Sequence, residues 1–420
     1  MHIVLFEDEE YRNLLPLTYW RGVFELRCGC GSLADHVRAA YPSAALSLFV
    51  RPALAAVVTE RVGLRVNVMP DAETILFLNG RALLREPLNV PDAPSAAWVD
   101  DRLLWARLTR AQAGRLTPET LLDVYATRRA LADVPEVEPS RNAPPLIRYP
   151  WDLVHKNSDM IVHAWRRFAD RGIEGELCDG VHVLARDNVW VGQNSRIKPG
   201  VVLDAEDGPI LIGNGVTIQP NATVQGPTYI GDGTVVQTGV AVRSGTSIGP
   251  VCKIGGEIEG SILHGYSNKQ HDGFLGHAYV GEFVNLAADT VNSDLKNTYG
   301  RIRVPINGVE VDSGQMFVGL TIGDHSKTGI GQLFPTGAVV GFGSSVATSN
   351  LAPKFIGSFR WVTDEVDEPY NAERCLAVAR TVMARRNRTL SAAEESLFRK
   401  LPDIARHHEC AAERQPVLQA

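Results

Sequence analysis

Aliphatic residues recur at every sixth position along the second half of the chain. The longest run without a slip is Ile212, Ile218, Val224, Ile230, Val236, Val242, Ile248 and Ile254. The same spacing holds in Val191, Ile197 and Leu203, in Phe274, Val280 and Leu286, and in Ile322, Thr328, Phe334, Val340 and Val346. A period of six fits neither a helix of 3.6 residues per turn nor the two-residue alternation of a simple strand.

Gly, Asn or Asp follows many of these aliphatic residues, as in Ile-Gly-Asn-Gly and Ile-Gly-Asp-Gly. These residue types take the positive-φ backbone of tight corners at low cost. The pattern predicts short strands joined by corners, with three hexapeptides to each triangular coil and the aliphatic side chains inside. We therefore expect a left-handed parallel β-helix over residues 173–361. An ordinary β-sandwich, with turns every eight to twelve residues, fits the unbroken period poorly.

Three further segments flank the predicted β-helix. Residues 1–150 alternate strand-like HIVLF and TILFLNG with helix-like LADHVRAAY and PETLLDVYATRRALA, which indicates a small α/β domain. Residues 151–172 suit one amphipathic linker helix. Residues 362–420 predict two helices, near 370–387 and 391–408, the second begun by a capping box of Ser391 and Glu394. We expect these helices to cover the open end of the last coil.

Composition favours an ordinary globular protein, with 45% hydrophobic and 21% charged residues. The net charge of −6 gives no case for nucleic acid or an anionic membrane as a partner. No apolar run approaches a membrane span, and MHIVLFEDEE is unlike a signal peptide. The six cysteines, which include Cys28, Cys30 and Cys410, form no C-x-x-C pair. Reduced thiols in a cytoplasmic protein are therefore expected, with Cys28 and Cys30 as small core residues.

Polar residues gather where the period lapses, in residues 264–297. Such a lapse in a regular solenoid is a natural place for function. His271 is the candidate general base, because acyl transfer from a thioester needs a group that takes a proton from the nucleophile near neutral pH. A lone histidine is more often structural, so the pattern by itself leaves both interpretations open.

The segment KQHDGFLGHAYVGEFVNLAADT resembles the acetyltransferase half of the bifunctional glucosamine-1-phosphate N-acetyltransferase / N-acetylglucosamine-1-phosphate uridylyltransferase family. Its archaeal- and Bacteroidetes-type branch of sugar nucleotidyltransferases is closer still. That likeness lies in GYSNKQHDGFLGH, NSDLKN, GDHSKTGI, the insertion RIRVPINGVEVDSGQMFVG and the tail AVARTVMARRNRTLSAAEESLF.

The resemblance implies a role for each matching residue. His271 would be the general base. The acceptor sugar would contact Lys269, Phe274, Asn285, Asp294 and Lys296. Coenzyme A would pass Ala288, His325 and Lys327. Two positions depart from the family pattern, because Phe274 replaces a tyrosine and Asp294 replaces an asparagine; both bear on the identity of the acceptor. A solvated surface charge is the plain alternative for each lysine.

The same resemblance implies the reaction and the assembly. The donor would be acetyl-CoA and the acceptor an amino-sugar phosphate such as glucosamine 1-phosphate, in the synthesis of UDP-N-acetylglucosamine or related cell-envelope precursors. The protein would be a homotrimer with its site between neighbouring β-helices, since a triangular prism offers flat faces and a second chain supplies the concavity.

The N-terminal domain resembles a degenerate sugar nucleotidyltransferase. Acidic EDEEYRN stands in place of the Gly-rich loop that cradles a triphosphate, and FLNGR ends in Arg81 where an Asp would hold Mg²⁺. Mg²⁺ is thus expected only if this domain is active, and no other metal is predicted. Arg21, Arg27 and Arg81 remain candidates for a phosphate. The pair Asp100-Asp101 suits a helix N-terminus better than a metal site.

Two alternatives to a simple acyltransferase stay open on sequence. A bifunctional enzyme would also form a nucleotide sugar from a sugar 1-phosphate and a nucleoside triphosphate. A non-catalytic trimeric scaffold or sensor would use the β-helix as a binding surface.

Overall fold

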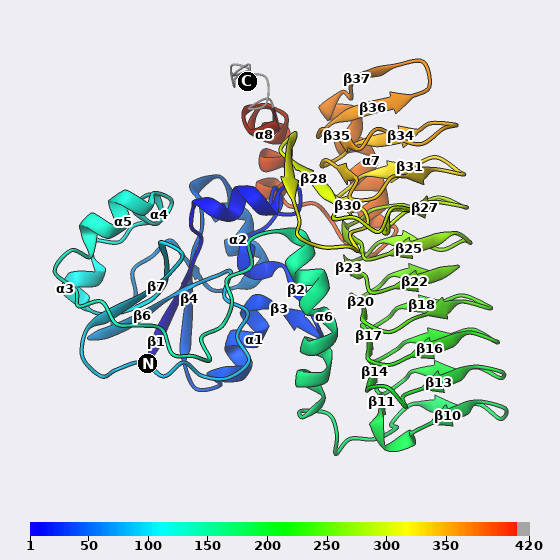
Figure 1. Ribbon diagram of the computed structural model, residues 1–420, viewed down its shortest axis with the longest axis horizontal. Helices are drawn as coiled ribbons and strands as arrows, with labels where there is room; N and C mark the ends of the chain where they lie inside the picture. Colours follow the sequence, from blue (N-terminus) through cyan, green and yellow to red (C-terminus); the bar gives the residue numbers. More distant parts are fainter. Residues whose placement is uncertain (410–420) are drawn as a thin grey trace.

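A computed structural model describes residues 1–409, and Cys410 lies outside the described residues. An N-terminal α/β domain lies beside a tall β-helix, and helix α6 (Pro150–Trp165) runs between the two (Figure 1). The predicted fold class, an α/β domain followed by a left-handed β-helix and C-terminal helices, is confirmed.

A mixed six-stranded sheet, in the order β5-β4-β1-β6-β8-β7, forms the N-terminal domain. Its strands are β1 (His2–Phe6), β4 (Ala45–Phe49), β5 (Arg65–Val66), β6 (Thr74–Asn79), β7 (Ser95–Val99) and β8 (Arg102–Thr109). Around it lie α1 (Leu33–Ala40), α2 (Ala55–Val62), α3 (Arg110–Ala113), α4 (Pro118–Leu121) and α5 (Val124–Ala130), the 3-10 turns η1 (Glu9–Leu14), η2 (Val23–Glu25) and η3 (Pro52–Leu54), and the hairpin β2 (Arg27–Cys28) and β3 (Gly31–Ser32). The strands β1, β4, β5 and β6 are parallel, and β8 is antiparallel to both of its neighbours.

Two local predictions for this domain need correction. The single helix expected over PETLLDVYATRRALA is two, because Asp123 leaves the helical backbone and its carboxylate caps α5 by accepting from the Ala126 amide at 2.9 Å. Asp100 and Asp101 form a left-handed turn between β7 and β8, with φ of 46° and 61°, and do not begin a helix. Cys28 is buried as predicted, and Cys30 is half-buried.

The β-helix has three faces, visited in a fixed order by each coil. Face 1 holds β10 (His182–Leu184), β13 (Val202–Asp204), β16 (Thr223–Gln225), β19 (Ala241–Val242), β22 (Glu257–Glu259) and β25 (Phe274–Gly276), then β27 (Val291–Asn292) and β32 (Leu333–Phe334). Face 2 holds β11 (Val189–Val191), β14 (Ile210–Ile212), β17 (Thr228–Ile230), β20 (Thr246–Ile248), β23 (Ile262–Gly265), β26 (Tyr279–Glu282), β30 (Thr321–Ile322), β33 (Val339–Val340) and β35 (Phe355–Ile356); the short 3-10 turn η4 (Arg186–Asn188) precedes β11. Face 3 holds β9 (Glu176–Leu177), β12 (Arg196–Ile197), β15 (Thr217–Ile218), β18 (Val235–Val236), β21 (Lys253–Ile254), β24 (Asn268–Lys269), β31 (Lys327–Thr328), β34 (Ser345–Ala347) and β36 (Arg360–Thr363).

The inward positions confirm the period of six. Every aliphatic residue from Val191 to Ile254 in the predicted series has no exposed surface. The phase changes after Ile254, because Ile258 follows it by four residues and carries the next inward side chain. Leu275 pairs with Ile258 in register, so Leu275 points inward, and the assignment of that slot to Phe274 was wrong. Lys269 pairs with Ile254 and takes an inward slot.

The linker helix and the C-terminal helices hold the two halves together. Helix α6 ends at Trp165, earlier than predicted, and lies on face 2 (Figure 1). Its Asn157 accepts from the Gly29 amide and donates to the Gly245 carbonyl, each at 2.7 Å. Helices α7 (Ala372–Ala384) and α8 (Ala392–Glu409) and the capping box of Ser391 and Glu394 are confirmed.

These two helices do not cover the last coil, contrary to our expectation. Helix α7 packs beside the corner between faces 2 and 3, where the Cys375 thiol reaches the Gly343 carbonyl. Helix α8 reaches both halves, since Glu409 accepts from Ser358 of the β-helix and from Tyr19 of the N-terminal domain. The final strand β36 pairs with antiparallel β37 (Asp367–Pro369). No helix within residues 1–409 is long and apolar enough to cross a lipid bilayer.

A buried ion cluster joins the N-terminal domain to face 2. The Arg21 guanidinium donates to Asp324 at 2.7 and 3.1 Å and to Glu282 at 2.9 Å, and its side chain is 1% exposed. Burial disfavours its charge, but the carboxylates of Asp324 and Glu282 outweigh burial and raise the pKa of Arg21. Arg21 therefore stays charged and ties the two halves together.

We expect Arg21→Ala to destabilise the protein by about 3–5 kcal/mol, because it leaves two carboxylates unpaired in a buried interface. Urea unfolding would measure the loss. Arg38→Ala is the matched control, since Arg38 and its partner Asp35 are about half exposed, at 48% and 50%, and such pairs contribute at most about 1 kcal/mol. Equal unfolding midpoints for the two variants would contradict this prediction.

Candidate active site

His271 lies at the corner between face 3 and face 1, after β24 and before β25. Its side chain is exposed. The neighbouring coil places Ala288 and Asp289 beside this corner, because the Asp289 amide donates to the Asp272 carbonyl at 3.0 Å. The imidazole is therefore accessible to a ligand, on a corner whose backbone is fixed by the coil above.

Lys269 holds the same corner from inside the β-helix. Its ammonium donates to the carbonyls of His271 at 2.5 Å, Asp272 at 2.8 Å and Gly255 at 3.4 Å, and its side chain has no exposed surface. Burial lowers its pKa to about 8, against the opposing pull of the Asp272 and Asp289 carboxylates. The expectation that Lys269 contacts a phosphate was wrong, because its inward slot turns it away from the surface. Lys269 instead positions the backbone that carries His271.

Asn285 belongs to a polar row on face 3. Isolated bridges and strand register place Lys253, Asn268, Asn285 and Lys327 on successive rungs. Asn268 donates its side-chain amide to the Asn285 side-chain oxygen at 3.2 Å. Both asparagines and both lysines are half-buried. Asn285 and Lys327 thus share the face on which the strand leading to His271 runs.

A second histidine cluster lies at the corner between face 1 and face 2. The Nδ1 atom of His277 is 2.8 Å from Asp294, and its ring stacks on Phe317 with centroids 5.0 Å apart. His155 of α6 lies beside it, with ring centroids 6.0 Å apart, and hydrogen-bonds the Phe317 carbonyl at 2.9 Å. Burial, together with His277, lowers the pKa of His155.

Our sequence reasoning missed His277. His277 stands 17 residues before Asp294. The same separation relates Asn268 to Asn285, which lie on adjacent rungs. Extending that coil period from face 3 to face 1 would have paired His277 with Asp294. The carboxylate of Asp294 thus has a protein partner and is not a free charge beside a substrate phosphate.

Phe274 and Lys296 each make contacts within their own part of the chain. Phe274 is half-buried on face 1, and its ring packs so close to Gly276 that a Cβ there would fall 2.6 Å from it. Lys296 lies between β27 and β30, in the segment that also contains the hairpin β28 (Arg303–Ile306) and β29 (Val309–Asp312). Its ammonium donates to the Arg301 carbonyl at 2.7 Å. The Lys296 ammonium therefore has a hydrogen-bond partner within its own segment.

His325 is buried, so the expected contact with coenzyme A was wrong. Its ring stacks on Phe283 with centroids 5.1 Å apart and lies among Trp20, Phe342 and Phe398. It is 2% exposed, and burial lowers its pKa well below the ordinary value, which keeps it neutral. The N-terminal domain and α8 cover it, as the sequence could not reveal. Its carbonyl accepts from the Lys327 ammonium at 2.8 Å.

Buried polar side chains occupy the switch point of the N-terminal sheet. In a sheet of this order, ligands bind beyond the carboxyl ends of the strands where the order reverses, between β1 and β6. Arg81, 0% exposed, fills this place with hydrogen bonds to Asp8 and an ion pair to Glu10 at 3.2 Å. The cavity lined by Asp8 and Glu9 has about 10 Å³.

All three arginines proposed as phosphate contacts already bond to groups of the protein. Arg81 and Arg21 are committed to the ion pairs above, and Arg27 donates to the carbonyls of His264 and Cys30. Within residues 1–409, no three His, Cys, Asp or Glu side chains converge in an arrangement that holds a metal ion. The residues around Asp8 and Arg81 therefore do not fit a Mg²⁺ site.

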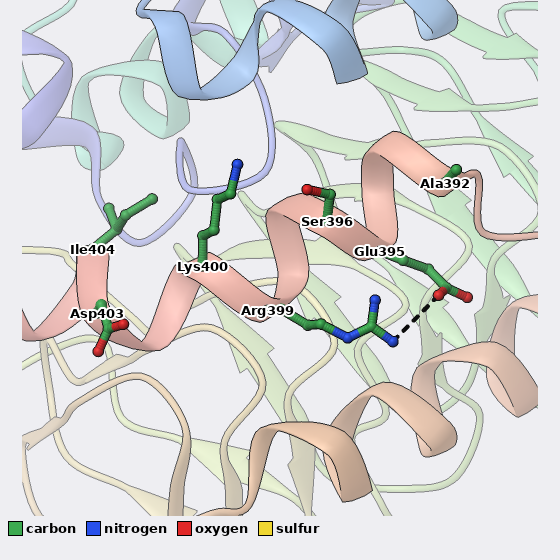
Figure 2. Close-up of a pocket in the computed structure, with 7 residues that line it drawn as sticks. All are labelled: Ala392, Glu395, Ser396, Arg399, Lys400, Asp403 and Ile404. Atoms are coloured by element: carbon green, nitrogen blue, oxygen red, sulfur yellow. Dashed lines mark hydrogen bonds and ion pairs between the residues drawn. The ribbon is translucent and has the colours of Figure 1, made fainter.

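An open hollow of about 700 Å³ lies along the outer face of α8 (Figure 2). All of its lining residues come from this one helix, and Arg399 lies 3.5 Å from Glu395. Its charges are of both signs, and Glu395 and Asp403 form ion pairs with Arg380, Arg399 and Arg406.

Two family models match the chain. The model described as sugar nucleotidyl transferase matches residues 3–170, and the one described as bacterial transferase hexapeptide (six repeats) matches residues 209–244. The chain thus joins a region similar to sugar nucleotidyl transferases to a region of hexapeptide repeats. Both matched families are transferase families by description.

One curated relative is the bifunctional protein GlmU of Methanococcus vannielii, 31% identical over 112 residues. The match covers 26% of this chain and 27% of that protein, so the chain spans about a quarter of the relative's length.

Two solved structures illustrate the more distant similarity. UDP-N-acetylglucosamine acyltransferase from Campylobacter jejuni is 11% identical, covers 54% of this chain and 96% of its own, and has a TM-score of 0.21. AntD, an N-acyltransferase from Bacillus cereus in complex with dTDP and 3-hydroxybutyryl-CoA, is 10% identical, covers 50% and 87%, and has a TM-score of 0.16.

We expect no pyrophosphate release when the protein is mixed with a sugar 1-phosphate, UTP or dTTP, and Mg²⁺. The reason is that Asp8, Glu10 and Arg81 fill the crevice in which a nucleotide would lie. A coupled pyrophosphate assay measures the release, with inorganic pyrophosphate added as the positive control. Sustained release that depends on nucleotide would contradict this expectation.

Lys269 predicts a specific pH dependence of stability. Its pKa is about 8 in the folded chain and about 10.4 in an unfolded chain. Between these values the unfolded chain binds more protons at this site, so stability rises with pH. We expect wild-type stability, measured relative to Lys269→Met by urea unfolding, to rise between pH 8 and about 10. A difference that stays constant over this range would contradict the assigned burial.

Proposed function

We propose that the protein is an acyl-CoA-dependent N-acyltransferase that transfers an acetyl group to an amino-sugar phosphate such as glucosamine 1-phosphate. The two transferase family matches and the partial similarity to GlmU support this reaction class. The product would feed the synthesis of nucleotide sugars for the cell envelope.

One observation carries the proposal. The exposed imidazole of His271 stands on a corner whose own carbonyl is fixed by the buried ammonium of Lys269 at 2.5 Å. A general base needs access to its substrate together with a fixed position. In support of this role, the corner leaves the imidazole accessible and fixes the backbone that carries it, within the polar segment that resembles the acetyltransferase family.

The chemistry follows from the roles of a base and a thioester. The acceptor amine attacks the thioester carbonyl carbon, and His271 takes the proton that the amine nitrogen loses. The tetrahedral intermediate collapses as the carbon–sulfur bond breaks. The coenzyme A thiolate leaves with the bonding electrons and receives the proton from the His271 imidazolium. The amide bond forms with no net change in protons on the enzyme.

We further propose that three chains assemble and that the site lies between two of them. His271 is exposed on a convex corner, so a single chain does not enclose a substrate around it. A neighbouring β-helix would supply the opposite wall. Asn285, Phe274 and Ala288 would then line the acceptor and donor paths on the chain that carries His271.

The test follows thiol release from acetyl-CoA with a panel of amino-sugar phosphates, glucosamine 1-phosphate first. We expect His271→Ala to lower turnover at least about 100-fold while the assembly stays intact by light scattering. His182→Ala is the matched control, because His182 is another exposed histidine of the β-helix, on β10. It should retain full activity.

His277→Ala tests whether His277, which lies 2.8 Å from Asp294, is the base in place of His271. Loss of activity in this variant, with His271→Ala fully active, would move the base to the pair of His277 and Asp294. The acyltransferase would be refuted if the wild-type protein released no thiol with any acceptor of the panel and did not bind coenzyme A. That result would favour a scaffold or sensor.

A further inference from the structure

The loop between α7 and α8 brings an unusual set of cations to face 3. It reads Arg385-Arg386-Asn387-Arg388. The Arg386 guanidinium donates to the side-chain oxygen of Asn268, and Arg388 lies over the Tyr266 ring at 5.5 Å. The loop therefore touches the rung that leads directly to His271, three residues further along, which is roughly 10 Å of extended chain.

Arg386 extends the polar row of face 3. It contacts Asn268, which donates to Asn285, and lysines stand on the rungs at either end of this pair, Lys253 below and Lys327 above. Rungs lie about 4.8 Å apart, so the four side chains span roughly 14 Å. The amide groups of Asn268 and Asn285 lie on the two middle rungs, and the Arg386 guanidinium contacts the first of them.

Two cations of this polar row, Arg386 and Lys327, lack the neighbouring carboxylates that accompany other buried cations of the described chain. The pKa values of Arg21, Arg61 and Arg81 are raised, because nearby carboxylates outweigh the effect of burial. The pKa of Arg386 is lowered by burial and by Arg385, and burial lowers the pKa of Lys327 to about 8. Within residues 1–409, Arg386 and Lys327 form no ion pair with a carboxylate, and the buried Nε atom of Arg386 has no hydrogen-bond partner.

Buried or half-buried positive charge without a carboxylate is costly unless an anion completes it. Guanidinium groups and side-chain amides are well matched to phosphate oxygens, the guanidinium through two parallel N–H donors. We propose that Arg386, with Asn268 and Lys327, forms a phosphate-binding subsite on face 3, about 10 Å along the chain from His271. As a substrate subsite it rests on the proposed function, but phosphate binding itself is measurable without turnover.

The first experiment measures binding of inorganic pyrophosphate to the full chain by calorimetry, against sodium chloride of equal ionic strength. We expect saturable binding that Arg386→Ala weakens at least about tenfold, the worth of one charge-assisted hydrogen bond. Arg374→Ala is the matched control, because Arg374 is exposed at the start of α7 and its loss changes net charge equally. Arg385→Ala, at an exposed position, gives a second variant that leaves the contact with Asn268 in place, and it should weaken binding less.

Equal affinity in Arg386→Ala and Arg374→Ala would overturn the subsite, as would binding of pyrophosphate no tighter than that of chloride. Circular dichroism and the unfolding midpoint establish that each variant is folded. If Arg386→Ala does not fold, Lys327→Met takes its place, because Lys327 is the other cation of the proposed subsite. Equal affinity in Lys327→Met and Arg374→Ala would then overturn the subsite.

Two pairs of ligands then identify the source of the phosphate. One pair is coenzyme A and dephospho-coenzyme A, and the other is glucosamine 1-phosphate and glucosamine. In the wild-type protein, the phosphorylated member of a pair should bind more tightly than the member without that phosphate. The subsite binds the phosphate of the pair for which Arg386→Ala abolishes this difference in affinity. If Arg386→Ala keeps both differences in affinity, the subsite binds neither substrate, and its assignment as a substrate subsite is refuted. Failure of thiol release alone, with pyrophosphate binding intact, would refute the acyltransferase and leave the phosphate subsite standing.

Discussion

A coil of the β-helix buries its aliphatic side chains only when another coil stacks upon it in register. The inward side chains from Val191 to Ile254 have no exposed surface because each lies between its equivalents one coil above and below. This constraint fixes which outward side chains share a rung. The contact of Asn268 with Asn285 and that of His277 with Asp294 both follow from a separation of 17 residues. The packing of the inward side chains therefore determines which outward polar side chains of the β-helix contact one another.

Lys269 shows what happens when the inner packing admits a charge. An ammonium in an aliphatic wall would be strongly unfavourable without partners. Three backbone carbonyls satisfy it, and two of them belong to the turn of His271 and Asp272. A side chain that weakens the core therefore fixes the corner on which the candidate base stands. This is the kind of local conflict that functional sites show.

The N-terminal domain keeps the nucleotidyltransferase sheet but uses its polar residues differently. Arg81 and Asp8 close the crevice at the switch point, and Arg21 reaches across to Asp324 and Glu282 of the β-helix. The charge of Arg81 thus closes the crevice, and the charge of Arg21 stabilises the contact between the two halves. Helix α8 completes this contact, with Phe398 packed against Trp20 and His325.

The amino-acid sequence by itself determined the β-helix, because a hydrophobic period of six admits no other regular structure. It also determined strands β1 and β6 of the N-terminal domain and the capping box of α8, which are short-range effects of patterning and capping. Several facts depended on the tertiary structure. A shortened step after Ile254 turned Phe274 outward and left Lys269 among the inward positions, and covering segments far away in the chain buried His325. Arg386 reached Asn268 across 118 residues. Burial and pairing over such separations depend on how whole segments pack, which a local pattern of residues does not encode.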